Sequence, residues 1–268
     1  MKNIAIQTFM LAVAFAALAP TTASAQLRIG GRAIDVKKAA QAASSAVSAI
    51  TLTDADVAEL CRESVVWMDA NNEIAGPDTE YGARLARLTE GLTEANGLPL
   101  NFKVYLVTDV NAFASGDGSV RVFSALMDIM DDDELVAIIG HEVGHVANHD
   151  VRDAIKTTYM AQAARGAISS TGGRAAALSD SQLGDLVSAF TDAQFSQSQE
   201  YAADEYGFSV CVDNGFSPYG MANSLQKLVD LSSASGAQAS VFQKMLSTHP
   251  DSAKRSSRMR EMADNHGK

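Results

Sequence analysis

The segment His141-Glu142-Val143-Gly144-His145 has the residue types and spacing of a zinc hydrolase. Two histidines four residues apart on a helix lie on one face, about one turn apart, so both imidazoles can bind one zinc ion. Glu142 lies beside them, where its carboxylate can take a proton from a zinc-activated water and pass it to a leaving amine. The motif therefore predicts metal-assisted hydrolysis of a peptide bond.

A catalytic zinc site needs a third protein ligand and one open position. His149 shares the helical face, but a spacing of eight residues places its ring roughly 12 Å from His141 along the helix axis. We therefore assign His149 a local hydrogen-bonding role. Glu200 is the better candidate, with Asp204 one turn later to accept the free ring N–H of one histidine. From the residues alone, the alternative is an exposed acidic helix face.

The elements that must position these residues are mostly helices. Helical spacing of apolar residues predicts helices at 33–49, from 53 to about 68, and at 78–94, 131–151 and 182–210. Alternating apolar and polar residues predict strands at 102–106 and 120–123. Residues 165–180 are rich in Gly, Ser and Ala, and we expect them to form a mobile lid. The fold class is therefore α+β, mostly α-helical, with a small β-sheet.

The first 25 residues are typical of a signal peptide. Lys2 precedes an apolar run from Thr8 to Pro20, which is too short to span a bilayer, and Ala23-Ser24-Ala25 forms an A-x-A cleavage pattern. We expect a soluble periplasmic protein that begins near Gln26 and has no transmembrane segment. A balance of 21 Lys+Arg against 32 Asp+Glu gives a net charge of -11, which excludes nucleic acid as a partner.

Export would also place the two cysteines of the chain in an oxidising compartment. Cys61 and Cys211 allow a single intramolecular connectivity, and an oxidising compartment favours a disulfide between them. The alternative is two buried free thiols.

Four motifs in a fixed order carry a resemblance to a known family. HEVGHVANH is preceded by NAFASGDGSVRVFSALM and followed by SQSQEYAADEYG and by Thr248-His249-Pro250 with Arg255. Over roughly residues 60–262 the chain resembles the HtpX-like and CAAX-prenyl-protease-like zinc metallopeptidases, which are of gluzincin type. The signal peptide, and the lack of membrane helices after it, make the chain similar to the soluble periplasmic branch of that family.

The resemblance implies a zincin-like domain with a small mixed β-sheet and one zinc ion per chain. It implies His141, His145 and Glu200 as zinc ligands, Glu142 as general base and Asp204 as the acid that orients a ligand.

Two further polar residues of the four motifs, His249 and Arg255, are assigned by their chemistry. We place His249 among the catalytic residues, near the open metal position or hydrogen-bonded to the tetrahedral oxyanion; the alternative is a loop histidine held by Pro250. Arg255 is expected to pair with acids around the site. The chain departs from the family at Gln197 or Gln199, next to the ligand helix, where the family commonly has Arg.

An exposed strand edge would hold an extended peptide over the zinc ion. We expect this edge at 119–123, with 111–114 shaping the adjoining wall; the alternative is an internal strand. The predicted substrate-binding residues are Asn111, Ala112, Phe113, Ala114, Ser119, Val120, Arg121 and Val122. Because main-chain pairing accepts many sequences, we expect unfolded or misassembled exported polypeptides as substrates.

The expected organisation is a signal peptide at 1–25, an N-terminal helical segment at 26–52, a zinc metallopeptidase domain at 53–262 and a disordered tail at 263–268. The expected function is that of a zinc metalloendopeptidase in envelope quality control. The alternative is a latent or non-cutting metal-binding assembly factor or chaperone of the periplasm. Glu142 favours the enzyme, because a scaffold has no need of a general base.

Overall fold

The computed structural model describes residues 26–29, 32–35, 53–164, 180–192, 194–233 and 245–267. The chain divides into two compact units, residues 1–43 and 44–268. In the first unit, β1 (Gln26–Ile29) and β2 (Arg32–Asp35) pair as an antiparallel hairpin. The prediction of a helix from residue 33 was therefore wrong at its start, and residues 36–52 lie outside the described part. The predicted signal peptide also lies outside it.

The second unit begins with two capped helices. Thr53 and Asp56 form a capping box at the start of α3 (Asp54–Asn71), where a helix start was predicted. Thr79 caps α4 (Glu80–Leu88), which ends six residues before the predicted helix end at 94. The chain then forms a short hairpin, β3 (Glu94–Ala95) and β4 (Leu98–Pro99).

A three-stranded mixed sheet lies next to the candidate site. Its strands are β5 (Asn101–Tyr105), β6 (Ala112–Ala114) and β7 (Ser119–Phe123), in the order β5-β7-β6. β7 is parallel to β5 and antiparallel to β6. Together with the many helices, this sheet confirms the expected α+β class.

The sheet order corrects the predicted substrate edge. β7 is the central strand and is paired on both sides, so Ser119, Val120, Arg121 and Val122 have no free edge to offer a peptide. The edge strands are β5 and β6, and the one beside Glu142 is β6, which was predicted only as an adjoining wall.

Three helices follow the sheet. They are α5 (Ser124–Ile129), α6 (Asp132–Ala147) and α7 (Asp150–Ala164). Asp131 and Glu134 form the capping box of α6, and nearly every residue of α6 is buried. The helix predicted to continue to 151 ends earlier, because His149 has a left-handed φ of 64°. The His149 side chain contacts Asn96, with Nε2 and Nδ2 2.6 Å apart, and takes the local role predicted for it.

The C-terminal half contains α8 (Asp180–Thr191), α9 (Gln197–Asp213), α10 (Gly220–Ser232) and α12 (Ser252–Asn265). The single helix predicted over 182–210 is therefore two helices, the second of which is capped by Ser196. The disordered tail predicted from 263 was also wrong, since α12 continues to Asn265. The His266 ring lies edge-on against Phe208, with centroids 5.6 Å apart.

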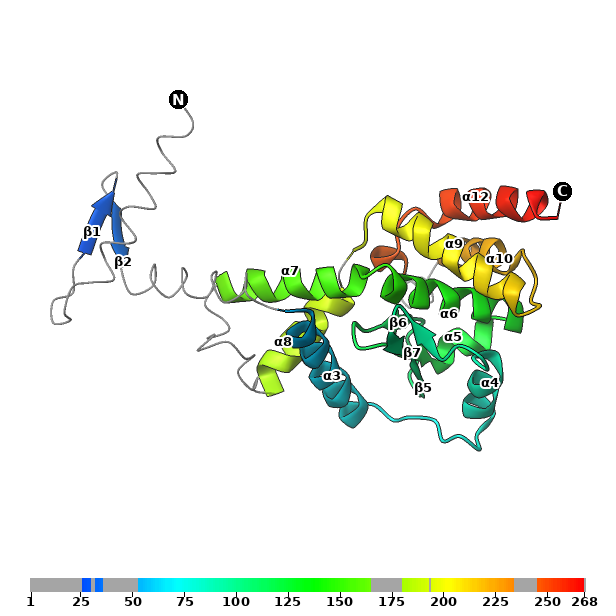
Figure 1. The fold of residues 1–268 in the computed structure, drawn as a ribbon, viewed down its shortest axis with the longest axis horizontal. Helices are drawn as coiled ribbons and strands as arrows, with labels where there is room; N and C mark the ends of the chain where they lie inside the picture. The colour runs from blue at the N-terminus through cyan, green and yellow to red at the C-terminus, as the bar shows by residue number, and fades with distance from the viewer. Residues whose placement is uncertain are drawn as a thin grey trace, which may run out of the picture. The chain divides into compact units, whose positions relative to one another are not determined.

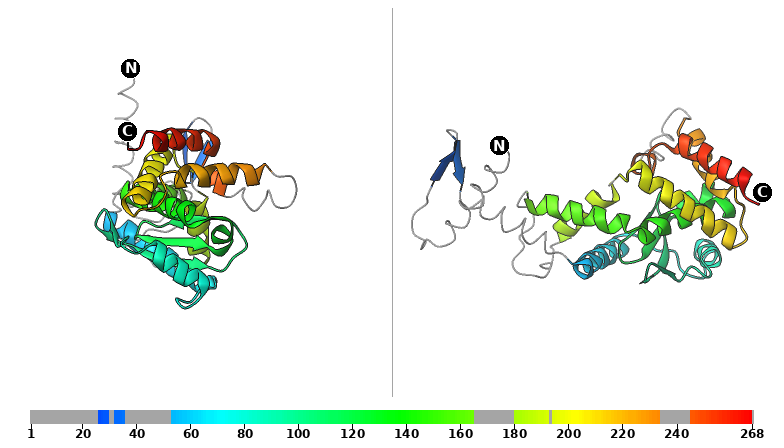
Figure 2. Two further views of the ribbon diagram at one scale, coloured as in Figure 1. Left: turned by 90° about the vertical axis from the view of Figure 1, so that its right-hand side faces the viewer. Right: turned by 45° about the horizontal axis from the view of Figure 1, so that its top comes forward.

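α6 is the central element of the second unit. Figure 1 shows α9 and α10 above it and the sheet below it, and the contacts between elements agree. Figure 2 shows α12 lying over α9 and α10. A second group is formed by α3, α7 and α8, which contact one another. The segment of α6 from His141 to His145 is therefore enclosed between helices and sheet.

The two cysteines belong to these different groups. Cys61 is on α3, where its Sγ would lie 2.8 Å from a Cβ added at Gly116, and Cys211 on α9 lies 3.8 Å from the main-chain oxygen of Asp133. Both are buried free thiols, and burial raises the pKa of each to about 12. The predicted disulfide was wrong, because the two helices pack against different neighbours.

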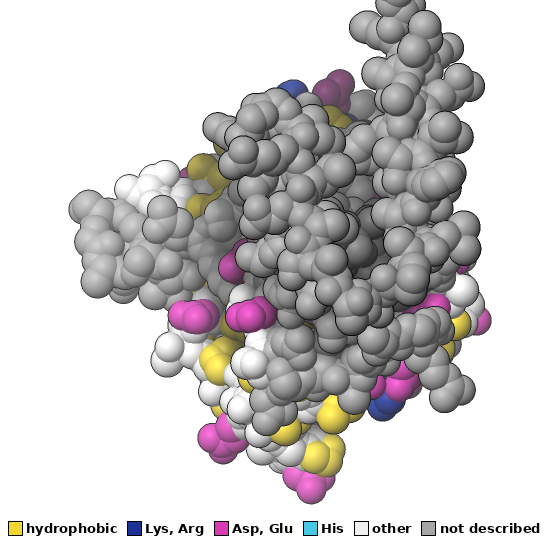
Figure 3. Space-filling model, turned by 90° about the vertical axis from the view of Figure 1, so that its left-hand side faces the viewer, with side chains coloured by type: hydrophobic (Ala, Val, Ile, Leu, Met, Phe, Trp, Pro, Cys, Tyr) yellow, Lys and Arg dark blue, Asp and Glu magenta, His cyan; other side chains and the backbone are white. Residues whose placement is uncertain are grey.

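No helix in the described part of the chain is both long and apolar enough to cross a membrane. On the face drawn in Figure 3, acidic side chains stand out at several places and basic ones at few, as the net charge of -11 implies.

Candidate metal centre

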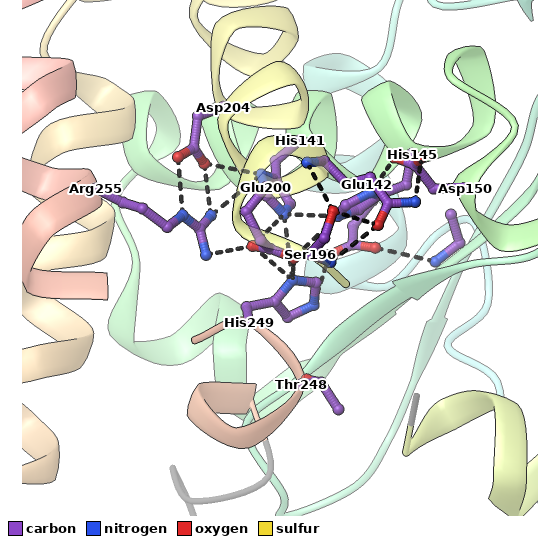
Figure 4. A network of polar contacts seen from close by, with 12 residues as sticks. His141, Glu142, His145, Asp150, Ser196, Glu200, Asp204, Thr248, His249 and Arg255 are labelled. Carbon is purple, nitrogen blue, oxygen red and sulfur yellow. Dashed lines mark hydrogen bonds and ion pairs between the residues drawn. The ribbon is translucent and has the colours of Figure 1, made fainter. Parts of the chain in front are cut away.

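Four buried side chains converge between α6, α9 and the segment before α12. His141 and His145 come from α6, Glu200 from the first turn of α9, and His249 from the Thr248-His249-Pro250 segment. One donor atom from each lies within 4.8 Å of the others, and Figure 4 shows them pointing toward one another. The structure thus brings together the three predicted zinc ligands and adds His249.

This donor set has the chemistry of a zinc site. Imidazole nitrogens and a carboxylate oxygen are the ligands that zinc prefers, and all four side chains are shielded from water. The Nε2 atoms of His141 and His145 are 3.1 Å apart, and His249 Nδ1 is 3.1 Å from Glu200 Oε1. Donor atoms of four side chains from separate elements meet within 4.8 Å of one another, so one cation fits among them.

The approach of α9 to α6 depends on glycines. A Cβ added at Gly207 would lie 2.6 Å from the carbonyl oxygen of Ala137 and 3.0 Å from the backbone nitrogen of His141. A Cβ at Gly144 would lie 3.0 Å from Ala203 Cα. The two helices therefore pack with their backbones close together, which places Glu200 within reach of the histidines.

Each histidine of α6 is oriented by an acid. His141 Nδ1 lies 2.9 Å from Asp204 Oδ1, and His145 Nδ1 lies 2.9 Å from Asp150 Oδ2. Bonds at Nδ1 leave Nε2 of both rings directed at the centre, as in many metal sites. Asp204 was predicted for this position but Asp150 was not. Asp150 lies five residues after His145 in the sequence. This spacing indicates a contact only once the helix is known to end at His149.

A buried arginine lies behind the acids. Arg255 forms ion pairs with Glu200 and with Asp204, and its Nε donates to Asp204 Oδ2 over 2.8 Å. Its side chain is 1% exposed. Burial would lower the pKa of Arg255, but the two carboxylates outweigh it and raise that pKa. The structure places Arg255 among the acids, as the sequence predicted.

Burial and charge act in opposite directions on the ligands. Burial lowers the pKa of His141, and the bond to Asp204 only partly offsets this. Burial also acts to lower the pKa of His145, but hydrogen bonds to Asp150 and Glu200 raise it to about 9. Burial would raise the pKa of Glu200, yet the neighbouring histidines hold it well below its usual range. Glu200 is therefore an anion.

Glu142 is buried at the edge of the sheet. Its Oε2 accepts a hydrogen bond of 3.1 Å from the backbone N–H of Ala114 in β6. Its Oε1 has no hydrogen-bond partner among the described residues and lies 3.6 Å from His249 Nε2. One carboxylate oxygen is thus held in place while the other remains available to a proton.

A cavity adjoins Glu142 and His249. Its lining comes from β6, α6, α7, the end of α8, the residues before α9 and the segment before α12: Asn111, Ala112, Phe113, Ala114, Glu142, Val151, Ala154, Thr191, Phe195, Thr248 and His249. The predicted residues 111–114 lie here, and Asn111 Oδ1 is buried without a partner in the described part of the chain. Phe195, which no sequence pattern indicated, stacks on the His145 ring with centroids 4.0 Å apart.

Comparisons with known proteins agree with this chemistry. Residues 81–263 match the model of Peptidase family M48. Metalloprotease YcaL of Escherichia coli (strain K12) is 38% identical over 85% of this chain and 88% of its own length. Metalloprotease LoiP of the same organism is 42% identical over 81% of this chain and 84% of its own length. The beta-barrel assembly-enhancing protease of Yersinia pestis is 32% identical over 59% of this chain and 34% of its own length.

Proposed function

The chain belongs to peptidase family M48 and is a zinc-dependent metalloprotease, and we propose that it cuts unfolded or misassembled polypeptides of the cell envelope at internal bonds. The substrate class is supported by the broad chemistry of the site and by one relative whose name refers to β-barrel assembly. The observation that carries the proposal is the convergence of His141, His145, Glu200 and His249 beside a buried Glu142.

We assign His141, His145 and Glu200 as the residues that hold the zinc ion. When bound, the ion supplies a Lewis acid that polarises the scissile carbonyl and activates a water molecule. Asp150 and Asp204 fix the ring orientation of the two histidines, and Arg255 balances the charge of Glu200 and Asp204. His249 supplies a fourth donor, next to the position where substrate must enter.

Glu142 is the proposed general base. The Ala114 N–H holds Oε2, so the proton taken from the attacking water goes to the unpartnered Oε1 and from there to the leaving amine. Because Oε1 is buried and close to His249 Nε2, the proton stays within the site until the amine leaves.

The proposed substrate edge is β6. Asn111 O and Ser115 N bond to β7, so the alternation of an antiparallel pair directs the backbones of Ala112 and Ala114 away from the sheet, toward Glu142. An extended peptide added along this edge would bind through its main chain, with Asn111 Oδ1 as a further acceptor. Binding of this kind requires an extended backbone and does not depend on a particular sequence, so it favours unfolded chains as substrates.

The proposed location is the periplasm. Residues 1–25 have the charged start, apolar run and A-x-A pattern of a signal peptide. The metallopeptidase domain would then begin at residue 53 and include α12, and any association with the membrane would come through partners.

The test compares degradation of an unfolded protein by the wild type and by Glu142→Gln, with zinc content measured on both. We expect the wild type to cut, and the variant to retain zinc and to cut about 10²- to 10⁴-fold more slowly, the range that a general base contributes. Glu205→Gln is the matched control, since Glu205 lies on α9 but pairs with Arg258 at the surface. If both proteins hold zinc and neither cuts, the proposal fails and an assembly factor is favoured.

A further inference from the structure

The carboxylate of Asp150 lies between two partners. Its Oδ2 is 2.9 Å from His145 Nδ1, and its Oδ1 accepts a hydrogen bond of 2.8 Å from Gln199 Nε2. Asp150 is 5% exposed and lies in the first turn of α7. Both oxygens of this buried acid are thus bound, and the orientation it gives His145 depends on Gln199 as well.

The other end of the Gln199 amide is also bound. Gln199 Oε1 accepts from the backbone N–H of Ser196 over 2.9 Å and from its hydroxyl over 2.7 Å, which forms the capping box of α9. Glutamate, the other residue common in a capping box, would accept the same bonds. It would not donate to Asp150, because an ionised carboxylate has no proton to give. The amide is therefore the group that meets both demands.

Gln199 also precedes Glu200 in the same turn of α9. The turn that provides one zinc ligand is thereby tied to the acid that orients another, across the N-terminal ends of α7 and α9. Partners that orient metal ligands commonly control metal affinity by about 10- to 100-fold. Gln199 contacts Asp150 and does not contact the histidine itself. We therefore expect its effect on zinc affinity to be at the lower end of that range.

We propose that Gln199 is a positioning residue that tunes zinc binding by holding Asp150 against His145. The inference rests on the proposed zinc site, and it gives a role to one of the two residues, Gln197 or Gln199, at which the chain departs from the family. The Gln199 amide is a neutral donor, so it leaves the negative charge of Asp150 available to His145.

The first measurement is the zinc dissociation constant, by competition with a chromophoric chelator, of the wild type, Gln199→Glu and Gln197→Glu. Gln197 is the matched control because it lies in the same turn and its Nε2 donates to Asp251. Both variants add one negative charge near the site, so their difference isolates the contact with Asp150. We expect Gln199→Glu to bind zinc about tenfold more weakly than Gln197→Glu.

The second measurement reverses donor and acceptor. In the double variant Asp150→Asn with Gln199→Glu, the Asn amide can donate to the new carboxylate while its oxygen still accepts from His145. We expect the double variant to bind zinc more tightly than Gln199→Glu alone. Equal affinities of the two Gln→Glu variants, or a double variant no better than Gln199→Glu, would overturn the proposal. Neither readout depends on catalysis, so absence of cleavage by the wild type would count against the protease substrate and leave this comparison intact.

Discussion

Buried charge at the centre is balanced residue by residue. Glu200 and Asp204 lie one turn apart on α9, and Arg255 pairs with both of them inside the protein. An unpaired buried carboxylate would protonate, since burial raises its pKa, but the guanidinium and the histidines keep both acids ionised. Glu200 is thereby available to a cation, and Asp204 remains an acceptor for His141.

His249 gives the first prediction at this scale. Catalytic zinc sites have three protein ligands and an open position, whereas sites with four protein ligands are closed. His249 Nδ1 lies 3.1 Å from Glu200 Oε1 and 3.3 Å from His141 Nε2, at the place of a fourth ligand. We expect His249→Ala to bind zinc about tenfold more weakly, and to cut an unfolded protein severalfold faster per zinc ion.

The rate and the zinc content of the His249→Ala protein must be measured together. His266→Ala is the control, because His266 packs against Phe208 and stands outside the cluster. A variant that retains zinc and loses activity would show that His249 takes part in the chemistry, and would contradict the prediction.

The α6–α9 pair shows how elements set the geometry of the site. Added bulk at Gly207 meets backbone atoms of α6, which cannot rotate away as a side chain would. We expect Gly207→Ala to lower the free energy of unfolding by about 2 kcal/mol, in the range of overpacked cores, and to weaken zinc binding as Glu200 moves away. Chemical unfolding of the zinc-free protein and a zinc titration measure the two effects separately.

Gly184→Ala is the matched control for that substitution. Gly184 lies within α8, and its added Cβ would meet only ring atoms of Trp67 at 3.6 Å, an ordinary contact. Because alanine favours helices over glycine, we expect a gain of up to about 1 kcal/mol here. Equal losses at Gly184 and Gly207 would show that helix packing at Gly207 is not the cause.

Asp69 joins α3 to the sheet and gives a prediction on pH. It accepts hydrogen bonds from Tyr105, Lys103 and Arg121, whose side chain is 1% exposed. Burial would raise the pKa of Asp69, but these three donors outweigh it and lower the pKa to about 2. A depressed pKa stabilises the fold above the unfolded pKa of about 3.9. That contribution is lost as the pH falls from about 4 to about 2.

We expect Asp69→Asn to lower the free energy of unfolding at pH 7 by about 2 kcal/mol. This is less than the cost of breaking a fully buried ion pair, because Asp69 is partly exposed. Urea unfolding of both proteins from pH 6 to pH 2 should show the gap closing below pH 4, since the wild type loses its charge there. A gap that stays constant with pH would mean that the carboxylate charge contributes nothing.

Much of the site follows from spacing, and the remainder depends on tertiary structure. His141 and His145 were predictable because four-residue spacing fixes a helix face whatever surrounds the helix. Spacing alone left Glu200 and Asp204 open to an exposed acidic face, and the family resemblance decided between the two interpretations. Asp150 was not, because its position depends on the left-handed His149 that ends α6. The central position of β7 depends on which strands pair in the folded chain. The alternation of apolar and polar residues within one strand does not indicate its partners. The break before Ser196 was also missed, although Ser196 and Gln199 carry a capping pattern.

For the whole molecule, the metal centre links parts that are far apart in the chain. His141 and His145 are on α6, Glu200 on α9, and His249 precedes α12, over 100 residues after His141. Figure 4 shows these side chains meeting between otherwise separate helices. An ion bound only by the folded state stabilises it by mass action, about 4 kcal/mol at a free concentration 1,000 times the dissociation constant. The ion is therefore expected to hold the second unit together as well as serve catalysis.

Removal of zinc with a chelator should then lower the melting temperature by about 10 °C, given about 2–4 °C per kcal/mol for a domain of this size. His145→Asn should melt near the zinc-free temperature with or without chelator, because it removes a ligand. His149→Asn is the matched control: it lies four residues on, outside the cluster, and asparagine tolerates the left-handed backbone there. The melting temperature of His149→Asn should fall on zinc removal by as much as that of the wild type. A wild type that loses its zinc without any change in melting temperature would show that the metal joins elements already held by their packing, and that its role is confined to catalysis.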